Sequence, residues 1–215
     1  MSKEKTGFLG QFTGVLYKPR AIFSTMDEGD LIKGIIVMLI MVILAAYSSM
    51  LYMSKIPLSV LTPMLEGVDV GQFEGTMGIM AGVGAGVTIL LGWVAGTFLM
   101  HGLSRLSGGD GSMKAFFAMH GFASVPSLFN QLLRIVDASI MDSNTLAGYF
   151  VAYRDTGSKL LKALVGTNLV NVWGLATVAL LIIAVEENYG LSRIRAFMIV
   201  LLPSVVYFLL NYFTG

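Results

Sequence analysis

Five long stretches without a charged residue dominate the hydrophobic pattern of the chain. They cover residues 34–54, 75–104, 115–133, 163–185 and 196–215, and their lengths are 21, 30, 19, 23 and 20 residues. A helix needs roughly 20 mainly apolar residues to cross the hydrocarbon core of a bilayer. The pattern therefore predicts five transmembrane helices, near residues 33–53, 77–103, 114–135, 164–186 and 194–213. We expect the second of them to tilt or to extend into water, because its stretch is longer than an upright helix requires.

Composition narrows the class of protein further. Residues of the AVILMFWYC set make up 55% of the 215 residues, charged residues only 13%, and the mean hydropathy is +0.77. A soluble domain carries about twice that share of charge. The formal net charge of +1 offers no field that would recruit a nucleic acid. These values predict an all-α, polytopic integral membrane protein whose bundle of five transmembrane helices covers residues 33–215.

Lysine and arginine positions predict the orientation of the bundle. The N-terminal segment and the loops on its side of the membrane carry nine of these residues, and the opposite side carries five. Because positively charged loops stay in the cytoplasm, we expect a multi-pass protein of the cell membrane with a cytoplasmic N-terminus and an external C-terminus.

The cytoplasmic N-terminal segment, residues 1–32, contains an amphipathic stretch with apolar residues at helical spacing: Phe8, Leu9, Phe12, Val15 and Leu16. Pro19 can open a second short helix there, since proline is tolerated in a first turn. Such a segment either lies on the inner membrane surface or docks a soluble partner. On the other side of the membrane, Leu146, Tyr149, Phe150 and Tyr153 share one helical face, which is typical of an interfacial helix.

The second predicted span is rich in glycine. Gly78, Gly82 and Gly86 recur every four residues and are followed by Gly92 and Gly96. Small residues at this spacing let helix backbones approach closely. The face they form is a candidate for packing within the bundle or, alternatively, for a homodimer contact or a helix that moves.

Polar residues inside the third and fourth spans form a candidate intramembrane patch. Its members are Ser124, Pro126, Ser127, Asn130 and Gln131 on the third span and Asn168 and Asn171 on the fourth. Pro126 removes the hydrogen bond to the carbonyl of Phe122 and should kink its helix. The polar side chains either satisfy one another between the two helices or line a path or a lipid pocket.

Candidate chemistry is sparse. His101 and His120 should lie at similar depth, and paired imidazoles could ligate haem, a pigment or a metal. No carboxylate lies near enough in sequence to complete a three-ligand site, so we expect two packing histidines and no cofactor. Cysteine is absent, which excludes thiolate metal sites and a Cys nucleophile. The short segment 107–111, Ser-Gly-Gly-Asp-Gly, lacks a second carboxylate for protease chemistry and is interpreted as a flexible turn.

Three groups of residues together resemble the Yip family, the Ypt-interacting-protein or Yip-domain membrane proteins. The first is Pro19 with Phe23, a Pro-x-x-x-Phe element before the membrane. The second is the glycine turn of residues 103–114, followed by a Gly-aromatic-Ala-Ser-x-Pro segment at 121–126. The third is Val172-Trp173 with residues 190–196. The short N-terminal tail is more similar to that of bacterial and archaeal members.

The resemblance implies five spans, a cytoplasmic N-terminus and no known catalysis. Eukaryotic members are linked to Rab-type GTPases and to ER–Golgi traffic. The first hypothesis is therefore a non-enzymatic membrane scaffold or adaptor, or a subunit of a membrane complex. Its partners would be the lipid bilayer and proteins in the membrane or a second copy of the chain, with no nucleic acid. The alternatives are a transport or channel protein that uses the polar patch and a haem or pigment carrier that uses the two histidines.

Overall fold

The computed structural model describes residues 7–61, 75–159 and 171–214, and the regular structure in these residues is helical throughout. The N-terminal segment forms α1 (Phe8–Tyr17), α2 (Pro19–Phe23) and the 3-10 turn η1 (Glu28–Asp30). The remaining elements are α3 (Leu31–Lys55), α4 (Leu58–Leu61), α5 (Met77–Leu106), α6 (Met113–Ala123), α7 (Val125–Ile140), α8 (Ser143–Asp155), α10 (Val172–Tyr189) and α11 (Arg193–Thr214).

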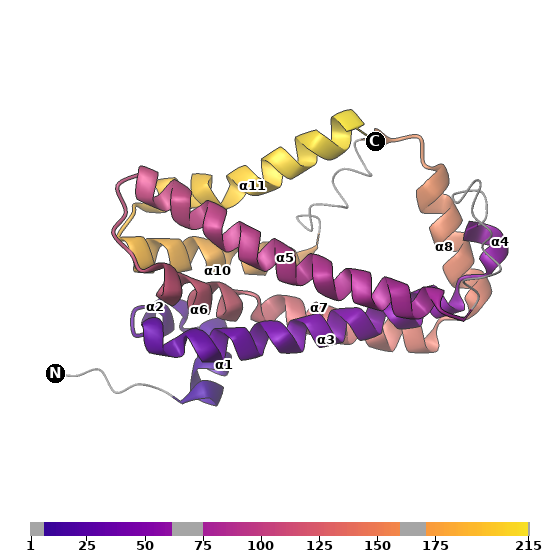
Figure 1. Ribbon diagram of the computed structural model, residues 1–215, viewed down its shortest axis with the longest axis horizontal. Coiled ribbons are helices and arrows are strands. Elements are labelled where there is room, and N and C mark those ends of the chain that lie inside the picture. The colour runs from indigo at the N-terminus through magenta and orange to yellow at the C-terminus, as the bar shows by residue number, and fades with distance from the viewer. Residues whose placement is uncertain (1–6, 62–74, 160–170, 215) are drawn as a thin grey trace.

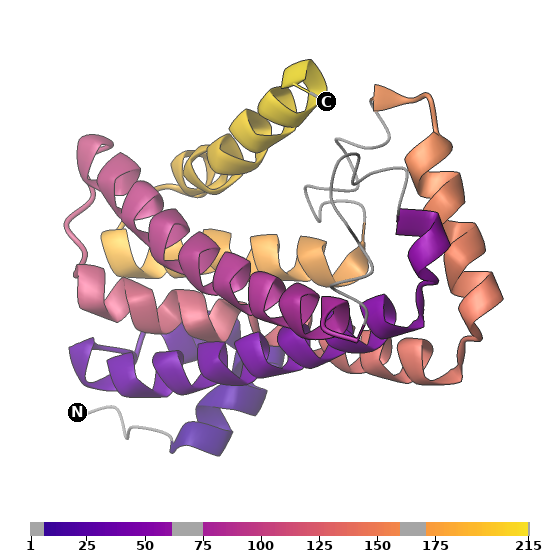
Figure 2. The same cartoon turned by 45° about the vertical axis from the view of Figure 1, so that its right-hand side comes forward.

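The long helices lie alongside one another and give the molecule two distinct ends (Figure 1). The N-terminal end holds α2, the starts of α3, α6 and α11, and the last turns of α5 and α10. The α8 end holds α4, α8, the last turns of α3 and α7, and the start of α5. In Figure 2, α11 diverges from α10 toward the C-terminus, and α8 stands across the ends of α3 and α7.

Within the described residues, three helical segments are long and apolar enough to cross a membrane: Glu28–Lys55, Met77–Leu106 and Val172–Tyr189. They correspond to the first, second and fourth predicted spans. The fourth was expected to begin at 164, and residues 164–170 lie outside the described residues. The helix α11 covers the fifth predicted span and contains Pro203.

The third predicted span is not the single kinked helix that we expected. It is two helices, α6 and α7, which are separated at Ser124. Pro126 lies in the first turn of α7, where its missing N–H leaves no hydrogen bond unmade. The Ser124 hydroxyl donates to the carbonyl of His120 and closes the last turn of α6. The helix α7 also continues to Ile140, beyond the expected end at 135.

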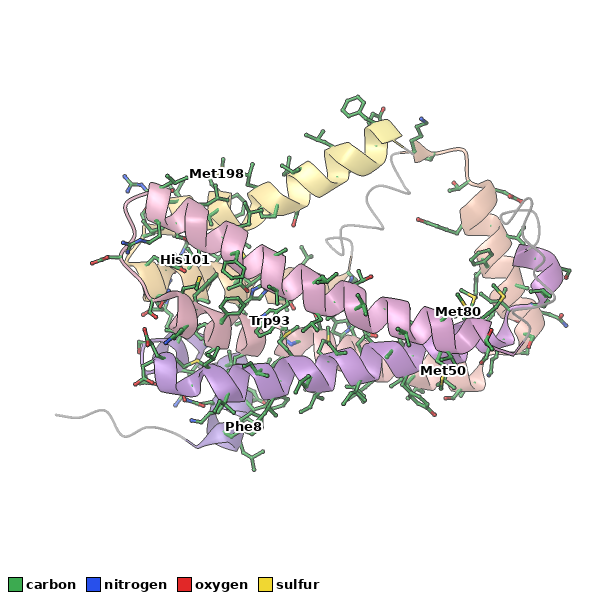
Figure 3. All side chains as sticks on the ribbon, in the orientation of Figure 1. Phe8, Met50, Met80, Trp93, His101 and Met198 are labelled. Carbon is green, nitrogen blue, oxygen red and sulfur yellow. The ribbon has the colours of Figure 1, made fainter. Side chains whose placement is uncertain are left out.

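The core of the bundle lies near its N-terminal end and includes the N-terminal segment. Val15 of α1, Phe23 at the end of α2, and Phe116 and Phe122 of α6 are fully buried in one cluster with residues of α3 and α10. The ring of Phe8 lies 5.9 Å from that of Phe122, so α1 covers the region where α6 ends. Figure 3 shows Phe8 on the side of the bundle where α1 packs. The described part of the N-terminal segment is therefore built into the same core as the long helices.

Candidate functional site

The polar residues predicted to form one intramembrane patch take part in separate contacts. The Ser127 hydroxyl shares a 2.9 Å hydrogen bond with the hydroxyl of Thr177 on α10. Gln131 is buried on another side of α7, and its Oε1 accepts a 3.0 Å hydrogen bond from Ser48 on α3. Each pair joins α7 to a different helix. These contacts satisfy the polar groups locally, and the sequence analysis missed both partners, Ser48 and Thr177.

The other members of the predicted patch are spread along the molecule. Pro126 is buried in the first turn of α7, and Asn130 lines a hollow of about 420 Å³ on the surface of α7. Asn171 is the N-cap of α10, where its Oδ1 accepts a hydrogen bond from the amide of Gly174. Asn168 lies outside the described residues. The described members therefore do not converge on one cavity.

The glycines of α5 divide into two groups. Gly78, Gly82 and Gly86 are buried against α3 and are called the glycine row below. A Cβ atom built on them would lie 3.1 Å from the Met50 carbonyl oxygen, 2.8 Å from that of Ala46, and 3.2 Å from Cγ1 of Val42. These short distances allow close contact between the two helices.

The last two glycines of the α5 set lie apart from the glycine row. A Cβ built on Gly92 would have no atom within 4 Å, and one built on Gly96 would lie 3.7 Å from Cε1 of His120. The candidate packing face therefore ends at Gly86, and its partner is a helix of the same chain.

Among the described residues, the closest contact between two helices involves glycines that no repeat pattern marks. A Cβ on Gly34 of α3 would lie 2.6 Å from Cα of Ala118, and one on Gly121 of α6 would lie 2.5 Å from the Gly34 carbonyl oxygen. Both contacts are with backbone atoms. The glycine that opens the Gly-aromatic-Ala-Ser-x-Pro segment thus has a steric role, because only a residue without a side chain fits between α3 and α6.

The segment 107–111 forms an ordered turn, not the flexible one expected. Gly108 has a φ of 88°, and a Cβ on Gly109 would lie 2.7 Å from Cβ of Tyr189. Gly111 packs against the backbone and side chain of Asn188. The Asn188 side chain donates to the Ser112 carbonyl, and the Asp110 amide donates to the Tyr189 carbonyl. The turn between α5 and α6 is therefore fixed against the end of α10.

Both histidines make hydrogen bonds within the bundle. Nδ1 of His101 lies 2.7 Å from the Tyr189 hydroxyl, and Nδ1 of His120 lies 2.7 Å from the Thr97 hydroxyl. His101 lies at the N-terminal end of the bundle (Figure 3). Within the described residues, no group of three or more His, Asp or Glu side chains could hold a metal ion. Each ring is thus hydrogen-bonded to a side chain of a neighbouring helix, His101 to α10 and His120 to α5.

A charged cluster joins the N-terminal segment to the end of α10. Glu186 is buried, with 8% of its side chain exposed, and it forms ion pairs with Arg20 of α2 and with Arg193 at the start of α11. Arg20 also pairs with Glu187 at 2.7 Å. A buried carboxylate is costly unless cations and hydrogen bonds compensate its charge. Arg20 therefore couples α2 to the bundle.

A second polar contact places α1 against the start of α3. Nε2 of Gln11 donates a 3.2 Å hydrogen bond to Oδ1 of Asp30, and both side chains are buried. Lys33 donates to the same oxygen at 2.7 Å. Losing these hydrogen bonds would leave two more buried polar groups without partners, which is expensive in a low-dielectric interior, so the contact holds α1 against the start of α3. Oε1 of Gln11 has no hydrogen-bond partner among the described residues. Gln11 lies between apolar residues in the sequence and was not singled out by their helical spacing.

The fixed N-terminal segment leaves apolar side chains on its outer surface. Leu9 and Tyr17 are 75% and 80% exposed, and Leu16 is partly exposed, whereas Phe8, Phe12 and Val15 of the same helix face the core. The expected apolar face is thus split into an inner part and an outer part. The outer part, Leu9, Leu16 and Tyr17, is called the α1 surface below, and it is the candidate interaction surface of the N-terminal end.

Charged and aromatic side chains also contact one another at the α8 end. The Tyr52 hydroxyl donates a 2.5 Å hydrogen bond to Oδ2 of Asp137, and the Arg134 guanidinium lies 5.4 Å from the centre of the Tyr52 ring. Lys55 donates to the carbonyls of Ser139 and Met141 and so caps the C-terminus of α7. The predicted spans end at 53 and 135, which placed Lys55 and Asp137 in loops, but α3 and α7 extend far enough to include them.

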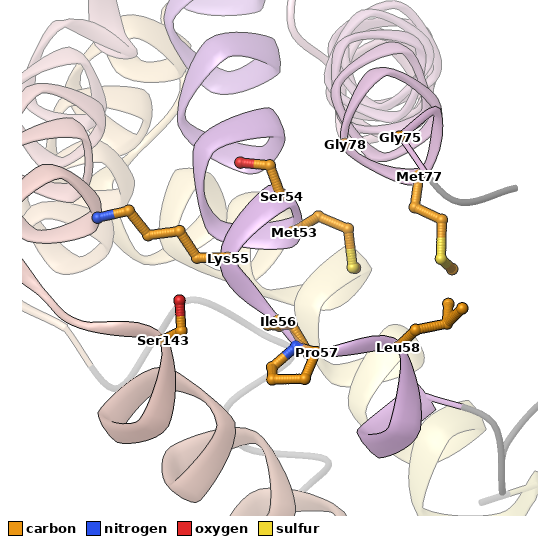
Figure 4. Close-up of a pocket in the computed structure, with 10 residues that line it drawn as sticks. All are labelled: Met53, Ser54, Lys55, Ile56, Pro57, Leu58, Gly75, Met77, Gly78 and Ser143. Carbon is orange, nitrogen blue, oxygen red and sulfur yellow. The ribbon is translucent and has the colours of Figure 1, made fainter.

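Two hollows lie at this end of the bundle. One, of about 360 Å³, lies between the end of α3 and the start of α5. Figure 4 shows Met53, Leu58 and Met77 converging there, whereas Lys55 points away. The other, of about 460 Å³, lies between α3, α7 and α8 and is called the α8 groove below. Its lining includes the expected aromatic face of α8: Leu146, Tyr149, Phe150 and Tyr153.

Comparisons with known proteins agree with the resemblance seen in the sequence. No curated protein and no solved structure matches the chain. The family model described as the Yip1 domain matches residues 13–213, a range that includes the docked helix α2, the glycine turn and the broken third span. Because this match covers most of the chain, the protein is a member of the Yip1 domain family.

Proposed function

We propose that this protein is a non-enzymatic membrane scaffold or adaptor whose N-terminal segment presents a surface to a protein partner. The single observation that carries the proposal is the α1 surface. The ion pairs of Arg20 and the buried hydrogen bond of Gln11 hold the segment on the bundle, while Leu9 and Tyr17 remain largely exposed. A rigid apolar surface needs little ordering when it binds, which favours affinity.

The proposal includes five spans and a cytoplasmic N-terminus. Three helices meet the length and hydropathy that a span requires, and α6–α7 and α11 supply the remaining two crossings. The excess of lysine and arginine on the N-terminal side supports the orientation. Single cysteines introduced as Ser2→Cys and Thr214→Cys test it, because the chain has no cysteine of its own. We expect external thiol reagents to label only the second variant in intact cells.

Site-specific crosslinking tests the proposed surface. A photoreactive residue at Tyr17 should form an adduct with a discrete protein in native membranes, and the same residue at Ile140, which is exposed at the other end, should not form that adduct. Arg20→Ala should reduce the yield of the adduct, because α2 then loses its contacts with Glu186 and Glu187. Adducts with lipid alone would instead indicate that α1 lies on the membrane surface, and would contradict the scaffold proposal.

A transport function has less support from the described residues. Ser127 and Gln131 hydrogen-bond to different helices, so they do not line a common path. Flux of small solutes through proteoliposomes would favour the transport alternative over the scaffold.

A further inference from the structure

The α8 groove combines an apolar wall with a pair of opposite charges. Met53, Leu146 and Phe150 contribute to the apolar wall, and Arg134 and Asp137 contribute from α7. Its volume of about 460 Å³ lies within the range of ~300–1,000 Å³ that is usual for small-molecule sites. Tyr149 and Tyr153 line the same groove and are exposed, as aromatic residues at a membrane–water boundary often are.

The two charges are available to a ligand. Arg134 and Asp137 are three residues apart on α7, so their side chains are neighbours on one helix face. Tyr52 donates to Oδ2 of Asp137, which leaves Oδ1 for a second donor. The Arg134 guanidinium lies over the Tyr52 ring, and no hydrogen bond or ion pair engages it within the described part of the chain. The same two residues also line the neighbouring hollow on α7, which gives a headgroup room beside the groove.

The charge pattern selects among membrane ligands. Arg134 would attract an anionic headgroup, but Asp137 would repel it. Asp137 would attract a purely cationic amphiphile, but Arg134 would repel it. A zwitterionic headgroup can place its phosphate on the guanidinium and its ammonium on the carboxylate. A primary ammonium can donate a hydrogen bond to Oδ1 of Asp137, whereas a quaternary ammonium has no N–H to donate.

We propose that the α8 groove binds a phospholipid with a phosphoethanolamine headgroup. One acyl chain lies against Met53, Leu146 and Phe150, the phosphate accepts hydrogen bonds from Arg134, and the primary ammonium donates to Asp137. The site is independent of the α1 surface, which lies toward the other end of the bundle, so either proposal can fail without the other.

Native mass spectrometry of the purified, delipidated full chain tests the site. The probes are dioleoyl phosphatidylethanolamine, phosphatidylcholine and phosphatidylglycerol, titrated separately. We expect phosphatidylethanolamine to bind most tightly. Arg134→Gln should weaken it about tenfold, the loss expected for one charge-assisted hydrogen bond. The control Lys114→Gln removes an exposed cation at the N-terminal end and should change nothing.

A second variant separates binding of the headgroup from folding. Asp137→Asn keeps an oxygen that can accept the hydrogen bond from Tyr52, so its fold should persist. It should lose the preference for phosphatidylethanolamine over phosphatidylcholine. Equal binding of the three lipids by the parent protein would overturn the proposal, as would tighter binding of phosphatidylglycerol, which would indicate simple attraction of an anion. If Arg134→Gln does not fold, binding of the three lipids to the parent protein and to Asp137→Asn still tests the proposal.

Discussion

At the N-terminal end of the bundle, the buried carboxylate of Glu186 lies between Arg20 and Arg193, whereas at the α8 end the Arg134 guanidinium faces an aromatic ring. The backbones also differ. The contact between Gly34 and Gly121 near the first end is closer than any contact of the glycine row, which lies toward the second. Close packing and charge compensation therefore occur together at the N-terminal end, which the N-terminal segment closes. The α8 end, where the charged side chains are less fully compensated, has a groove.

The largest expected effect tests the closed end. Gly121→Ala places a Cβ 2.5 Å from the Gly34 carbonyl oxygen, and neither helix backbone can move without disturbing the core. We expect a loss of about 3 kcal/mol in the free energy of unfolding, the upper part of the usual range for overpacking. Steric trapping or thermal unfolding in detergent measures it.

The matched control for this substitution is Gly84→Ala on α5, where the built Cβ has no atom within 4 Å. It should be neutral or should stabilise the protein by up to about 1 kcal/mol through helix propensity. If Gly121→Ala and Gly84→Ala unfold at the same temperature, α3 and α6 are not in close backbone contact.

The second expected effect concerns charge at the same end. Arg20→Ala removes one of the two cations that pair with Glu186, and Arg193 remains. Because Arg20 is about half exposed, solvent already screens part of the interaction. We therefore expect the free energy of unfolding to fall by about 1–2 kcal/mol. Hydrogen exchange should rise in α2 more than in α7. The exposed neighbour Lys18 offers a control, since Lys18→Ala should leave exchange in α2 unchanged.

The contrast between the ends also explains which parts of the molecule the sequence could predict. Charge-free stretches locate long apolar helices well, because charge is expensive in the hydrocarbon core. They misplace helix ends, since α7 continues through Arg134 and Asp137 to Ile140. A repeat every four residues marks the glycine row, but Gly34 and Gly121 are single glycines on different helices and carry no periodic signal. The pair of Arg20 and Glu186, 166 residues apart, likewise depends on tertiary structure.

The third expected effect tests the glycine row. The Cβ of Gly82→Ala would lie 2.8 Å from the Ala46 carbonyl oxygen, so even this small change requires α5 to shift. We expect the free energy of unfolding to fall by about 1 kcal/mol. This loss is smaller than for Gly121→Ala, because the glycine row lies near one end of α5 and that end can tilt away from α3. Gly82→Leu should cost about 1–3 kcal/mol. Ile79→Leu on the exposed face of α5 should be nearly neutral, and equal stability of Gly82→Leu and Ile79→Leu would contradict the packing of this row.

The smallest expected effect concerns the wall of the α8 groove. Asp142 is the N-cap of α8, where Oδ1 accepts from the amides of Asn144 and Thr145 and Oδ2 accepts from the Thr145 hydroxyl. Hydrogen bonds from Thr145 hold the pKa of the Asp142 carboxyl below its ordinary value of 3.8. Because folding lowers this pKa, the ionised cap stabilises α8 fully above pH 3.8. The stabilisation is lost as the pH falls through the lower pKa of the folded state. Hydrogen exchange in α8, corrected for intrinsic rates, should therefore be the same at pH 7 and pH 5 and should increase below pH 3.8.

The control is Asp142→Asn, which retains an oxygen acceptor but cannot ionise, so its exchange in α8 should lack this acid-dependent step. The N-terminal end has carboxylate contacts of its own, those of Asp30 and Glu186, so the comparison that isolates the cap is between the parent and Asp142→Asn. Because the cap is exposed and lies far from the core, exchange in α2 and α6 should be the same in the two proteins at each pH. If Asp142→Asn also changes the acid-dependent exchange of α2 and α6, the two ends unfold together, and the contrast between them does not extend to their local stability.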